Sequence, residues 1–143
     1  MRVLIIAGLA DSLVNFRGQL IQSMLTKGCE VHVAAPDMWQ SEASVHALRA
    51  WGAQLHEAKI DRTGKNPLAD LQTLRVLWQL MRQVRPELVL GYTIKPVIFG
   101  TIAAWLAGVP KRVALITGLG YAFQGERRAM LWMVQKLYAF ALR

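Results

Sequence analysis

The chain has 143 residues, of which 54% are hydrophobic and 18% charged, and its formal net charge is +8. This composition excludes an intrinsically disordered protein, and the length fits one domain with its own core. A single cysteine rules out an intrachain disulfide framework. The excess positive charge lies in residues 61–143, which hold twelve basic and four acidic side chains. An anionic partner is therefore expected there, with a phosphorylated ligand, a membrane surface and nucleic acid as the candidates.

The first half of the sequence predicts strands that alternate with helices. Residues 2–7 are a short apolar run typical of a first strand, too short for the apolar region of a secretory signal. A helix is expected over about 16–27, with Asn15 as its N-cap and Gly28 as its C-terminal stop. The following elements, in order, are a strand over 31–35, a short helix near 44–51 and a weak edge strand over 54–58.

The second half continues the same alternation. Asn66 followed by Pro67 is a strong helix start, and Pro86 ends that helix near residue 84. Its inward stripe is expected to contain Leu68, Leu71, Leu74, Leu77, Trp78 and Met81. The remaining elements, in order, are a strand over 88–90, a helix over 96–107, a strand over 113–116 and a last helix over about 126–142.

This alternation predicts an α/β fold with a doubly wound, mostly parallel, Rossmann-like sheet in a single domain over residues 1–143. The turn after the first strand reads Gly8-Leu9-Ala10-Asp11-Ser12, which is not the glycine-rich dinucleotide fingerprint. A nucleotide-dependent oxidoreductase is therefore disfavoured. Nucleic-acid binding is even less favoured as a function, because the basic residues are not interleaved with aromatic ones in a recognisable pattern.

Two strand-to-helix turns predict a ligand site. The stretch Tyr92-Thr93-Ile94-Lys95-Pro96 follows one buried strand, and Thr117-Gly118-Leu119-Gly120-Tyr121 follows the next. Such turns line up along the carboxyl edge of an open α/β sheet, where ligands bind. Lys95 stands just before a helix-starting proline, so lysine and helix end are expected to converge on one anionic group. The two glycines let backbone amides approach a ligand closely.

Arg17 and the three histidines are further candidates for a functional role. Arg17 at a helix N-terminus opposes the macrodipole, so it is either a solvated side chain or, with the helix end, holds an anion. The histidines at positions 32, 46 and 56 have no metal-ligand spacing and no carboxylate patterned with them. His32, on a core strand, is expected to be a satisfied structural residue. The sequence thus indicates no metal site.

Several of these residues, taken in order, carry a family resemblance. They are Asn15-Phe16-Arg17, then Glu30-Val31-His32-Val33-Ala34-Ala35-Pro36, then Thr93-Ile94-Lys95-Pro96 with Gly100, Ala103-Ala104 and Gly108-Val109-Pro110, and finally Thr117-Gly118-Leu119-Gly120. In this arrangement the sequence resembles family 4 glycosyltransferases. It is similar, more narrowly, to the bacterial members that build lipid-linked O-antigen, capsule or exopolysaccharide units.

The resemblance implies one half of a GT-B architecture, the N-terminal domain that chiefly holds the acceptor. The C-terminal donor domain and the final strands of the N-terminal domain would then be missing from residues 1–143. The expected substrate-binding residues are Asn15, Phe16, Arg17, Thr93, Lys95, Thr117, Gly118 and Gly120. Many family members have a histidine where this chain has Thr117, so a sugar-positioning histidine is not carried over and no catalytic residue is assigned.

The resemblance also implies partners. These are a nucleotide-sugar donor and a polyprenyl diphosphate-linked saccharide acceptor, handled with retention of configuration and without metal or other cofactor. The protein would then be cytoplasmic, and peripheral on the cytoplasmic face of an anionic inner membrane. The last helix places Arg128, Lys136 and Arg143 on one face, which is either a lipid-facing surface or part of an ordinary packed helix.

Two functions of different classes follow. The leading one is the acceptor half of a retaining glycosyltransferase, which alone is expected to be inactive because transition-state stabilisation needs both walls of the cleft. The alternative is a non-catalytic subunit that recruits the lipid acceptor for a separate donor-binding chain.

Overall fold

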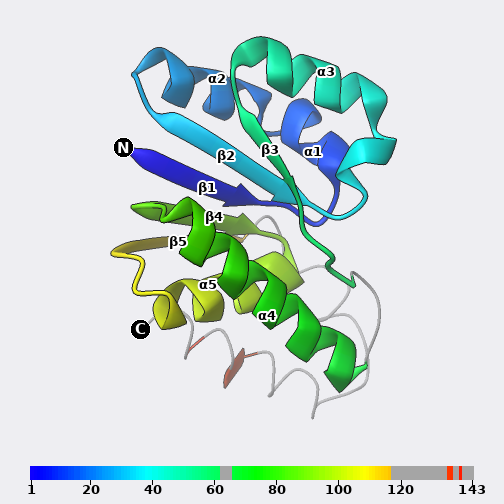
Figure 1. The fold of residues 1–143 in the computed structure, drawn as a ribbon, viewed down its shortest axis with the longest axis vertical. Coiled ribbons are helices and arrows are strands. Elements are labelled where there is room, and N and C mark those ends of the chain that lie inside the picture. Colours follow the sequence, from blue (N-terminus) through cyan, green and yellow to red (C-terminus); the bar gives the residue numbers. More distant parts are fainter. Residues whose placement is uncertain (62–65, 117–134, 137–138, 140–143) are drawn as a thin grey trace.

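The computed structural model describes residues 1–61, 66–116, 135–136 and 139. Its centre is a five-stranded parallel sheet in the order β3-β2-β1-β4-β5 (Figure 1). The strands are β1 (Arg2–Ile6), β2 (Glu30–Ala35), β3 (Gln54–Glu57), β4 (Leu88–Tyr92) and β5 (Lys111–Leu115). The expected α/β fold with a parallel, Rossmann-like sheet is confirmed.

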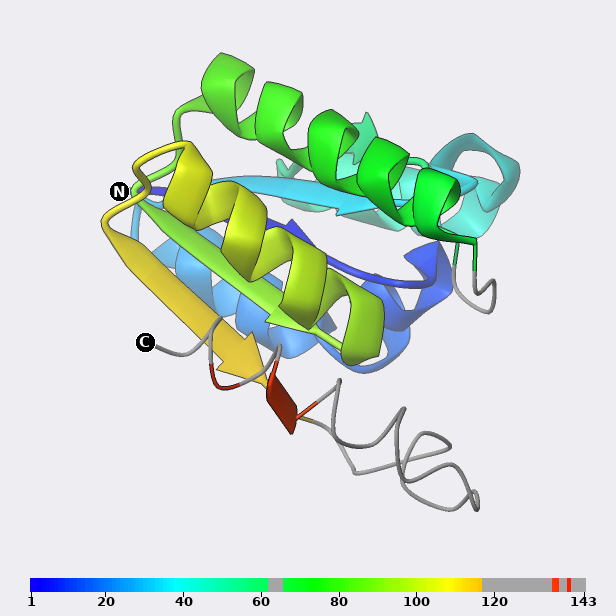
Figure 2. The ribbon, with the colours of Figure 1, turned by 90° about the horizontal axis from the view of Figure 1, so that it is seen from below.

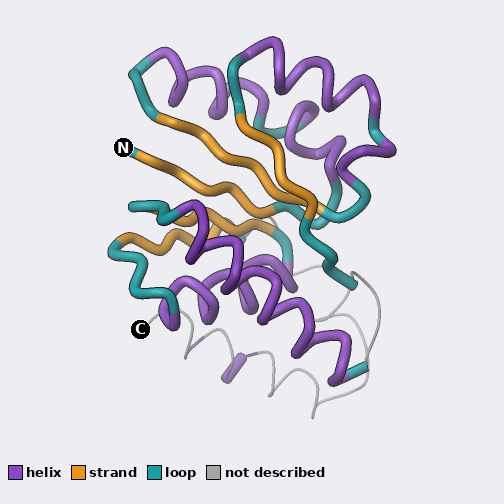
Figure 3. The backbone as a smooth tube through the Cα atoms, viewed as in Figure 1, coloured by secondary structure: helices purple, strands orange, loops and turns teal. Residues whose placement is uncertain are grey.

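Helices cover both faces of this sheet, as seen edge-on in Figure 2 and along the backbone in Figure 3. One layer contains α1 (Ala10–Asn15), α2 (Gly18–Thr26) and α3 (Glu42–Trp51), with the short 3₁₀ helix η1 (Met38–Gln40) before α3. The other contains α4 (Pro67–Val84) and α5 (Ile94–Leu106). Among the helices described, none is both long and apolar enough to cross a membrane.

Strand residues alternate between two cores. Val3 and Ile5 pack under the α1–α3 layer, whereas Leu4 and Ile6 pack under α4 and α5, and all four are fully buried. A strand buried on both faces needs apolar residues at every position. This explains why β1 reads as an unbroken apolar run instead of alternating with polar residues.

Several local predictions are confirmed. The Asn66 side chain caps α4 by accepting a hydrogen bond from the Leu68 amide at 3.1 Å, with Pro67 as the first helical residue. Gly28 follows α2 at φ 87°, a backbone conformation that side chains disfavour. The weak strand β3 lies at a sheet edge, as expected. Most of the last helix expected over 126–142 lies outside the described residues.

The helix expected over 16–27 is confirmed as α2, whereas Asn15 as its N-cap is wrong, because a further short helix ends there. α1 already begins at Ala10, and Asn15 is its last residue instead of a cap. Phe16 is still in the right-handed helical region, and the backbone leaves it at Arg17, with φ −119° and ψ 4°, before α2 begins at Gly18. From the sequence, a turn was expected over residues 8–12 and no helix before residue 16, so α1 was missed.

The inward stripe expected for α4 is also partly wrong. Leu68 is 76% exposed, Leu71 63% and Trp78 36%, so these three side chains lie on the outer side. The side that packs on the sheet contains Thr73, Leu77, Leu80, Met81 and Val84. Leucines on two sides of a helix satisfy the same 3.6-residue period, and the period alone cannot tell which side meets the sheet.

A hydrogen-bonded chain joins His32 to two neighbours. Its Nε2 lies 2.8 Å from a carboxylate oxygen of Glu30, and its Nδ1 lies 2.8 Å from Nε2 of His56. His32 is therefore the satisfied structural histidine that was expected. The sequence reading that no carboxylate accompanies the histidines is wrong, because Glu30 lies two residues away on the same face of β2. Since the carboxylate accepts the Nε2 proton, Nδ1 accepts the proton of His56.

This chain predicts that the protein loses stability on mild acidification. Burial, and next the charge of His32, lower the pKa of His56 from 6.5. The unfolded chain therefore takes up this proton at a higher pH than the folded chain does, and stability falls as pH drops through about 6.5. Urea denaturation midpoints should decrease between about pH 7.5 and pH 5.5.

The His56→Gln variant keeps an N–H donor toward His32 and should flatten this dependence. Substitution of the exposed His46 by glutamine is the matched control and should leave it unchanged. A wild-type midpoint that is constant across this range would contradict the account. At lower pH a second loss is expected, since the hydrogen bond from His32, and next that from Arg2, lower the pKa of Glu30.

Candidate functional site

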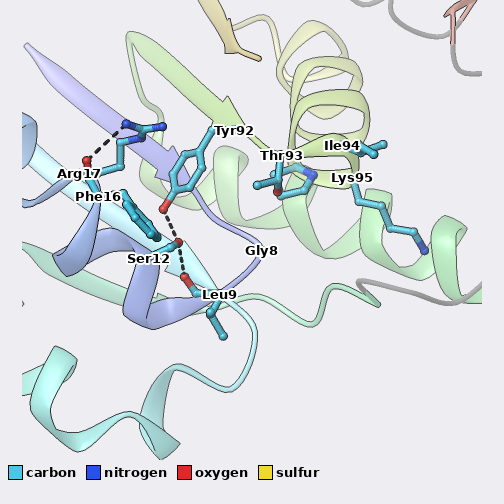
Figure 4. Close-up of a pocket in the computed structure, with 10 residues that line it drawn as sticks. Gly8, Leu9, Ser12, Phe16, Arg17, Tyr92, Thr93, Ile94 and Lys95 are labelled. Carbon is cyan, nitrogen blue, oxygen red and sulfur yellow. Dashed lines mark hydrogen bonds between the residues drawn. The ribbon is translucent and has the colours of Figure 1, made fainter. Parts of the chain in front are cut away.

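A cavity of about 630 Å³ opens at the carboxyl ends of β1 and β4 (Figure 4). These strands are neighbours in the sheet although 81 residues lie between Ile6, the last residue of β1, and Leu88, the first of β4, and the order of winding reverses between them. Ligands of open α/β sheets bind at such reversal points. The cavity is lined by Gly8, Leu9, Ser12, Phe16, Arg17, Tyr92, Thr93, Ile94, Lys95 and Pro96.

The break between α1 and α2 supplies one wall of this cavity. If the two helices were continuous, their side chains would follow one helical surface. Helix α1 instead ends at Asn15, and the non-helical backbone at Arg17 separates it from α2; both Phe16 and Arg17 line the cavity, and Phe16 is 73% exposed. Arg17 stands at the N-cap position of α2, so the expected pairing of an arginine with a helix N-terminus is confirmed, at a different helix boundary.

Hydrogen bonds between hydroxyl groups join the two walls. The Ser12 hydroxyl donates to the Leu9 carbonyl at 2.6 Å and lies 2.7 Å from the Tyr92 hydroxyl. A serine has one proton, so Tyr92 must donate the second hydrogen bond to Ser12. Figure 4 shows this chain running from β4 to the turn after β1. The Tyr92 ring is thereby held in a fixed position.

Arg17 lies against the ring that this chain holds. Its guanidinium carbon is 4.9 Å from the centroid of the Tyr92 ring, within the range of a cation–π interaction. One terminal nitrogen donates to the Phe16 carbonyl at 3.3 Å, whereas the buried Nε has no hydrogen-bond partner among the described residues. The guanidinium is thus positioned at the cavity with donors left for an anionic ligand.

Tyr92 stays protonated around neutral pH. Burial raises the pKa of its hydroxyl, and the Ser12 hydrogen bond and the Arg17 charge offset part of that rise. A neutral phenol donates one hydrogen bond, which Ser12 accepts. Tyr92 therefore positions Arg17 and is not suited to act as a general base.

The turn after β4 is strained. Thr93 has φ 68° and ψ 166°, a region that side chains other than glycine rarely occupy. Such a conformation costs on the order of 1–3 kcal/mol and is held by its surroundings. Here it turns the chain from β4 directly into α5, and places the first turn of that helix at the cavity.

The close fit of β4 against α5 depends on Gly91. A Cβ atom at this position would lie 2.8 Å from the Pro96 carbonyl oxygen and 3.1 Å from its carbon. Both atoms belong to the backbone and cannot move aside as a flexible side chain does. Gly91 therefore allows the N-terminal turn of α5 to approach the strand.

Lys95 occupies a different environment from the one expected. It is the second residue of α5, which begins at Ile94, and its Nζ lies 2.8 Å from a carboxylate oxygen of Asp70 on α4. Both side chains are partly buried, with 16% and 28% exposed. In Figure 4 Lys95 extends away from Tyr92 and Ser12. Its charge is thus balanced within the protein, and it ties the first turns of α4 and α5 together.

The expected site residues divide into three groups. Phe16, Arg17, Thr93 and Lys95 all line the cavity. Asn15 ends α1 and is not among the lining residues. Thr117, Gly118 and Gly120 lie outside the described residues.

The sequence reading missed two residues, Ser12 and Tyr92. Ser12 lies in α1 and Tyr92 ends β4, both within stretches expected from the sequence to be turns. The pairing of β1 with β4 is what brings their hydroxyl groups to 2.7 Å. A tyrosine at the end of a buried strand, with a serine after another, is the available signal. It becomes informative only when the strand order is known.

The chain matches the model of the glycosyl transferase 4-like family over residues 3–143 and belongs to that family. Its Rossmann-like domain is of the kind that forms one half of a GT-B glycosyltransferase. A curated relative from Campylobacter jejuni is N,N'-diacetylbacillosaminyl-diphospho-undecaprenol alpha-1,3-N-acetylgalactosaminyltransferase, which is 25% identical over 146 residues. The alignment covers 100% of this chain and 38% of the relative.

Solved structures show the same fold. The glycosyltransferase VinC, solved with dTDP, superposes with a TM-score of 0.60 at 19% identity, covering 99% of this chain and 38% of VinC. A deacetylase of teicoplanin biosynthesis superposes with a TM-score of 0.67 at 12% identity, covering 99% of this chain and 84% of the deacetylase. Because the two have different activities, this likeness supports the fold alone.

The contact at Gly91 predicts that Gly91→Ala destabilises the protein. The new methyl group must push β4 away from the first turn of α5, which should lower the unfolding free energy by about 1–3 kcal/mol in urea denaturation. Gly100→Ala is the matched control, because its Cβ would meet only the Cδ1 atom of Ile6, at 3.0 Å. An equal or smaller loss for Gly91→Ala would contradict the close packing described here.

Proposed function

We propose that the chain is the acceptor-binding half of a retaining glycosyltransferase. In this proposal the whole enzyme moves a sugar from a nucleotide-sugar to a saccharide linked to a polyprenyl diphosphate, in the synthesis of surface polysaccharide. The observation that carries the proposal is Arg17, fixed on the Tyr92 ring at the reversal point of the sheet. A guanidinium with unused donors suits a phosphate or diphosphate oxygen.

The relatives support the choice of acceptor. The Campylobacter jejuni enzyme is named for a diphospho-undecaprenol saccharide. All of the present chain aligns with it, over 38% of the length of that enzyme. The acceptor proposed here has the same chemistry, a diphosphate between a sugar and a long apolar chain. The cavity offers a cation for the diphosphate, and the exposed Phe16 and Leu9 side chains offer apolar surface beside it.

The proposed mechanism gives this domain a positioning role. Arg17 holds the diphosphate of the acceptor, and the first turn of α5 approaches the same ligand from the other wall. With the acceptor fixed, its sugar hydroxyl can be oriented toward a donor held by a second domain, which removes much of the entropic cost of the reaction. The membrane-embedded acceptor would place the enzyme at the cytoplasmic face of the inner membrane.

The alternative is a non-catalytic subunit that recruits the acceptor for a separate donor-binding chain. The chain spans 38% of the length of the curated relative, so on either proposal the donor half comes from elsewhere. A polypeptide that continues into a donor domain would support the enzyme, and co-purification with a separate donor-binding chain would support the subunit.

The full-length protein that contains residues 1–143 should transfer label from a nucleotide-sugar to a polyprenyl diphosphate saccharide. Arg17→Gln should lower kcat/KM at least about tenfold, because the diphosphate loses its charged partner. Arg17→Lys should recover part of this loss, since it restores the charge but not the planar pair of donors. Product is measured by thin-layer chromatography of the lipid extract.

Arg49→Gln is the matched control. Arg49 lies 5.3 Å from the centroid of the Trp39 ring, the same type of contact as Arg17 makes, but outside the cavity. Equal kinetics for Arg17→Gln and the wild type, with transfer intact, would contradict the role of the cavity. Absence of transfer to any polyprenyl diphosphate saccharide would contradict the acceptor class.

A further inference from the structure

The outer side of α4 carries an exposed row of apolar and basic residues, called here the α4 stripe. Its members recur at intervals of three and four residues, which places them along one side of the helix. They are Leu68, Leu71, Arg75, Trp78, Arg82 and, just after the helix, Arg85. All six are exposed, and α4 lies on the outside of its layer in Figure 2.

The charge on this surface has one sign. The other exposed positions along α4 are Pro67 and three glutamines at 72, 79 and 83, so no acidic residue is exposed on the helix. Its only acidic residue, Asp70, is partly buried and paired with Lys95. The three arginines of the stripe are therefore not neutralised by acidic side chains of the same helix.

The apolar members of the stripe are large and unusually open to solvent. Leu68 and Leu71 are 76% and 63% exposed, and Trp78 lies under the guanidinium of Arg82, 5.6 Å from its carbon. Single exposed leucines are ordinary, but a row of leucine, tryptophan and arginine on a helix with no exposed acidic residue is typical of helices that lie in a membrane interface. There the apolar side chains enter the acyl boundary and the arginines meet anionic headgroups.

The N-terminal end of the α4 stripe lies near the cavity. This end, at Leu68 and Leu71, flanks Asp70, whose partner Lys95 lines the cavity. On the other wall Phe16 and Leu9 are 73% and 44% exposed. A bilayer that rests on α4 would thus lie beside the Lys95 side of the cavity.

We propose that the α4 stripe docks this domain on an anionic lipid bilayer, so that a lipid-linked acceptor enters the cavity from the membrane. The lipid-linked acceptor rests on the function proposed above, whereas the docking surface does not. The lipid-facing surface expected on the last helix stays a separate prediction, because Arg128 and Arg143 lie outside the described residues. Arginines with no exposed acidic residue on the same helix favour an anionic surface, and the leucines and tryptophan favour one with an apolar interior.

Co-sedimentation with vesicles tests the proposal directly on the 143-residue chain. Binding to phosphatidylglycerol vesicles should exceed binding to phosphatidylcholine vesicles, and should weaken as salt rises, because exposed charges are screened beyond about 10 Å at 0.1 M. The double variant Arg75→Gln with Arg82→Gln should lower affinity for the anionic vesicles at least about tenfold. Trp78→Gln should lower it at fixed charge, since it removes only the interfacial ring.

The matched control is Trp39→Gln with Arg49→Gln, which removes an exposed Trp–Arg pair from the opposite layer. This control should bind anionic vesicles like the wild type. Equal binding by the α4 variants and the wild type, or no preference for anionic vesicles, overturns the proposal. So does a stable dimer that the α4 substitutions dissociate, because the stripe would then be an interface between copies.

A transfer assay separates this proposal from the proposed function. In the full-length protein the Arg75→Gln, Arg82→Gln variant should keep its activity on a detergent-dispersed acceptor, and lose activity on an acceptor embedded in anionic vesicles. Loss of both activities to the same extent overturns the docking role. If the wild type transfers to neither acceptor, the proposed function fails, while the vesicle-binding result still decides the role of the α4 stripe.

Discussion

The pairing of β1 with β4 is the interaction on which the candidate site depends. Ile6 lies opposite Gly91 in this register, so the turn after each strand opens at the same place on the sheet edge. Ser12 then reaches Tyr92, Tyr92 holds Arg17, and the first turn of α5 approaches from the other side. Without this pairing, the residues of the two walls would belong to unrelated turns.

Three local features keep that edge open to a ligand. The chain breaks between α1 and α2, which costs hydrogen bonds of a continuous helix but brings Arg17 to the cavity. Thr93 is held in a strained conformation, and Gly91 removes the side chain that would block α5. Local strain at a ligand site is expected where the surrounding structure fixes it. Here the buried apolar strands on either side provide that support.

Most of the fold follows from the sequence because buried parallel strands need unbroken apolar runs and their helices need apolar faces. The strands, the cap at Asn66 and the edge position of β3 were predicted for these reasons. The helix α1 was not, because its six residues are too few to show a helical apolar period. The outward side of α4 was not either, since Leu68 and Leu71 fit the same period as Leu77.

The site was predicted less completely, because it depends on strand order. Arg17 and Thr93 could be chosen from their turns alone, but the Ser12–Tyr92 contact requires knowing that β1 lies beside β4. For Lys95 the local sequence suggested a role that the tertiary structure does not support. Its place before a proline indicated an anion site, whereas its partner is Asp70, which lies 25 residues earlier in the sequence, on the neighbouring helix α4.

The central claim is that the crevice between β1 and β4 holds the diphosphate of a lipid-linked acceptor. A crystal structure of the protein with a short-chain polyprenyl diphosphate saccharide tests it most directly. The account predicts the diphosphate within hydrogen-bond distance of the Arg17 guanidinium, with Tyr92 still donating to Ser12. A diphosphate bound elsewhere, with Arg17 still on Tyr92 and the crevice empty, would contradict it.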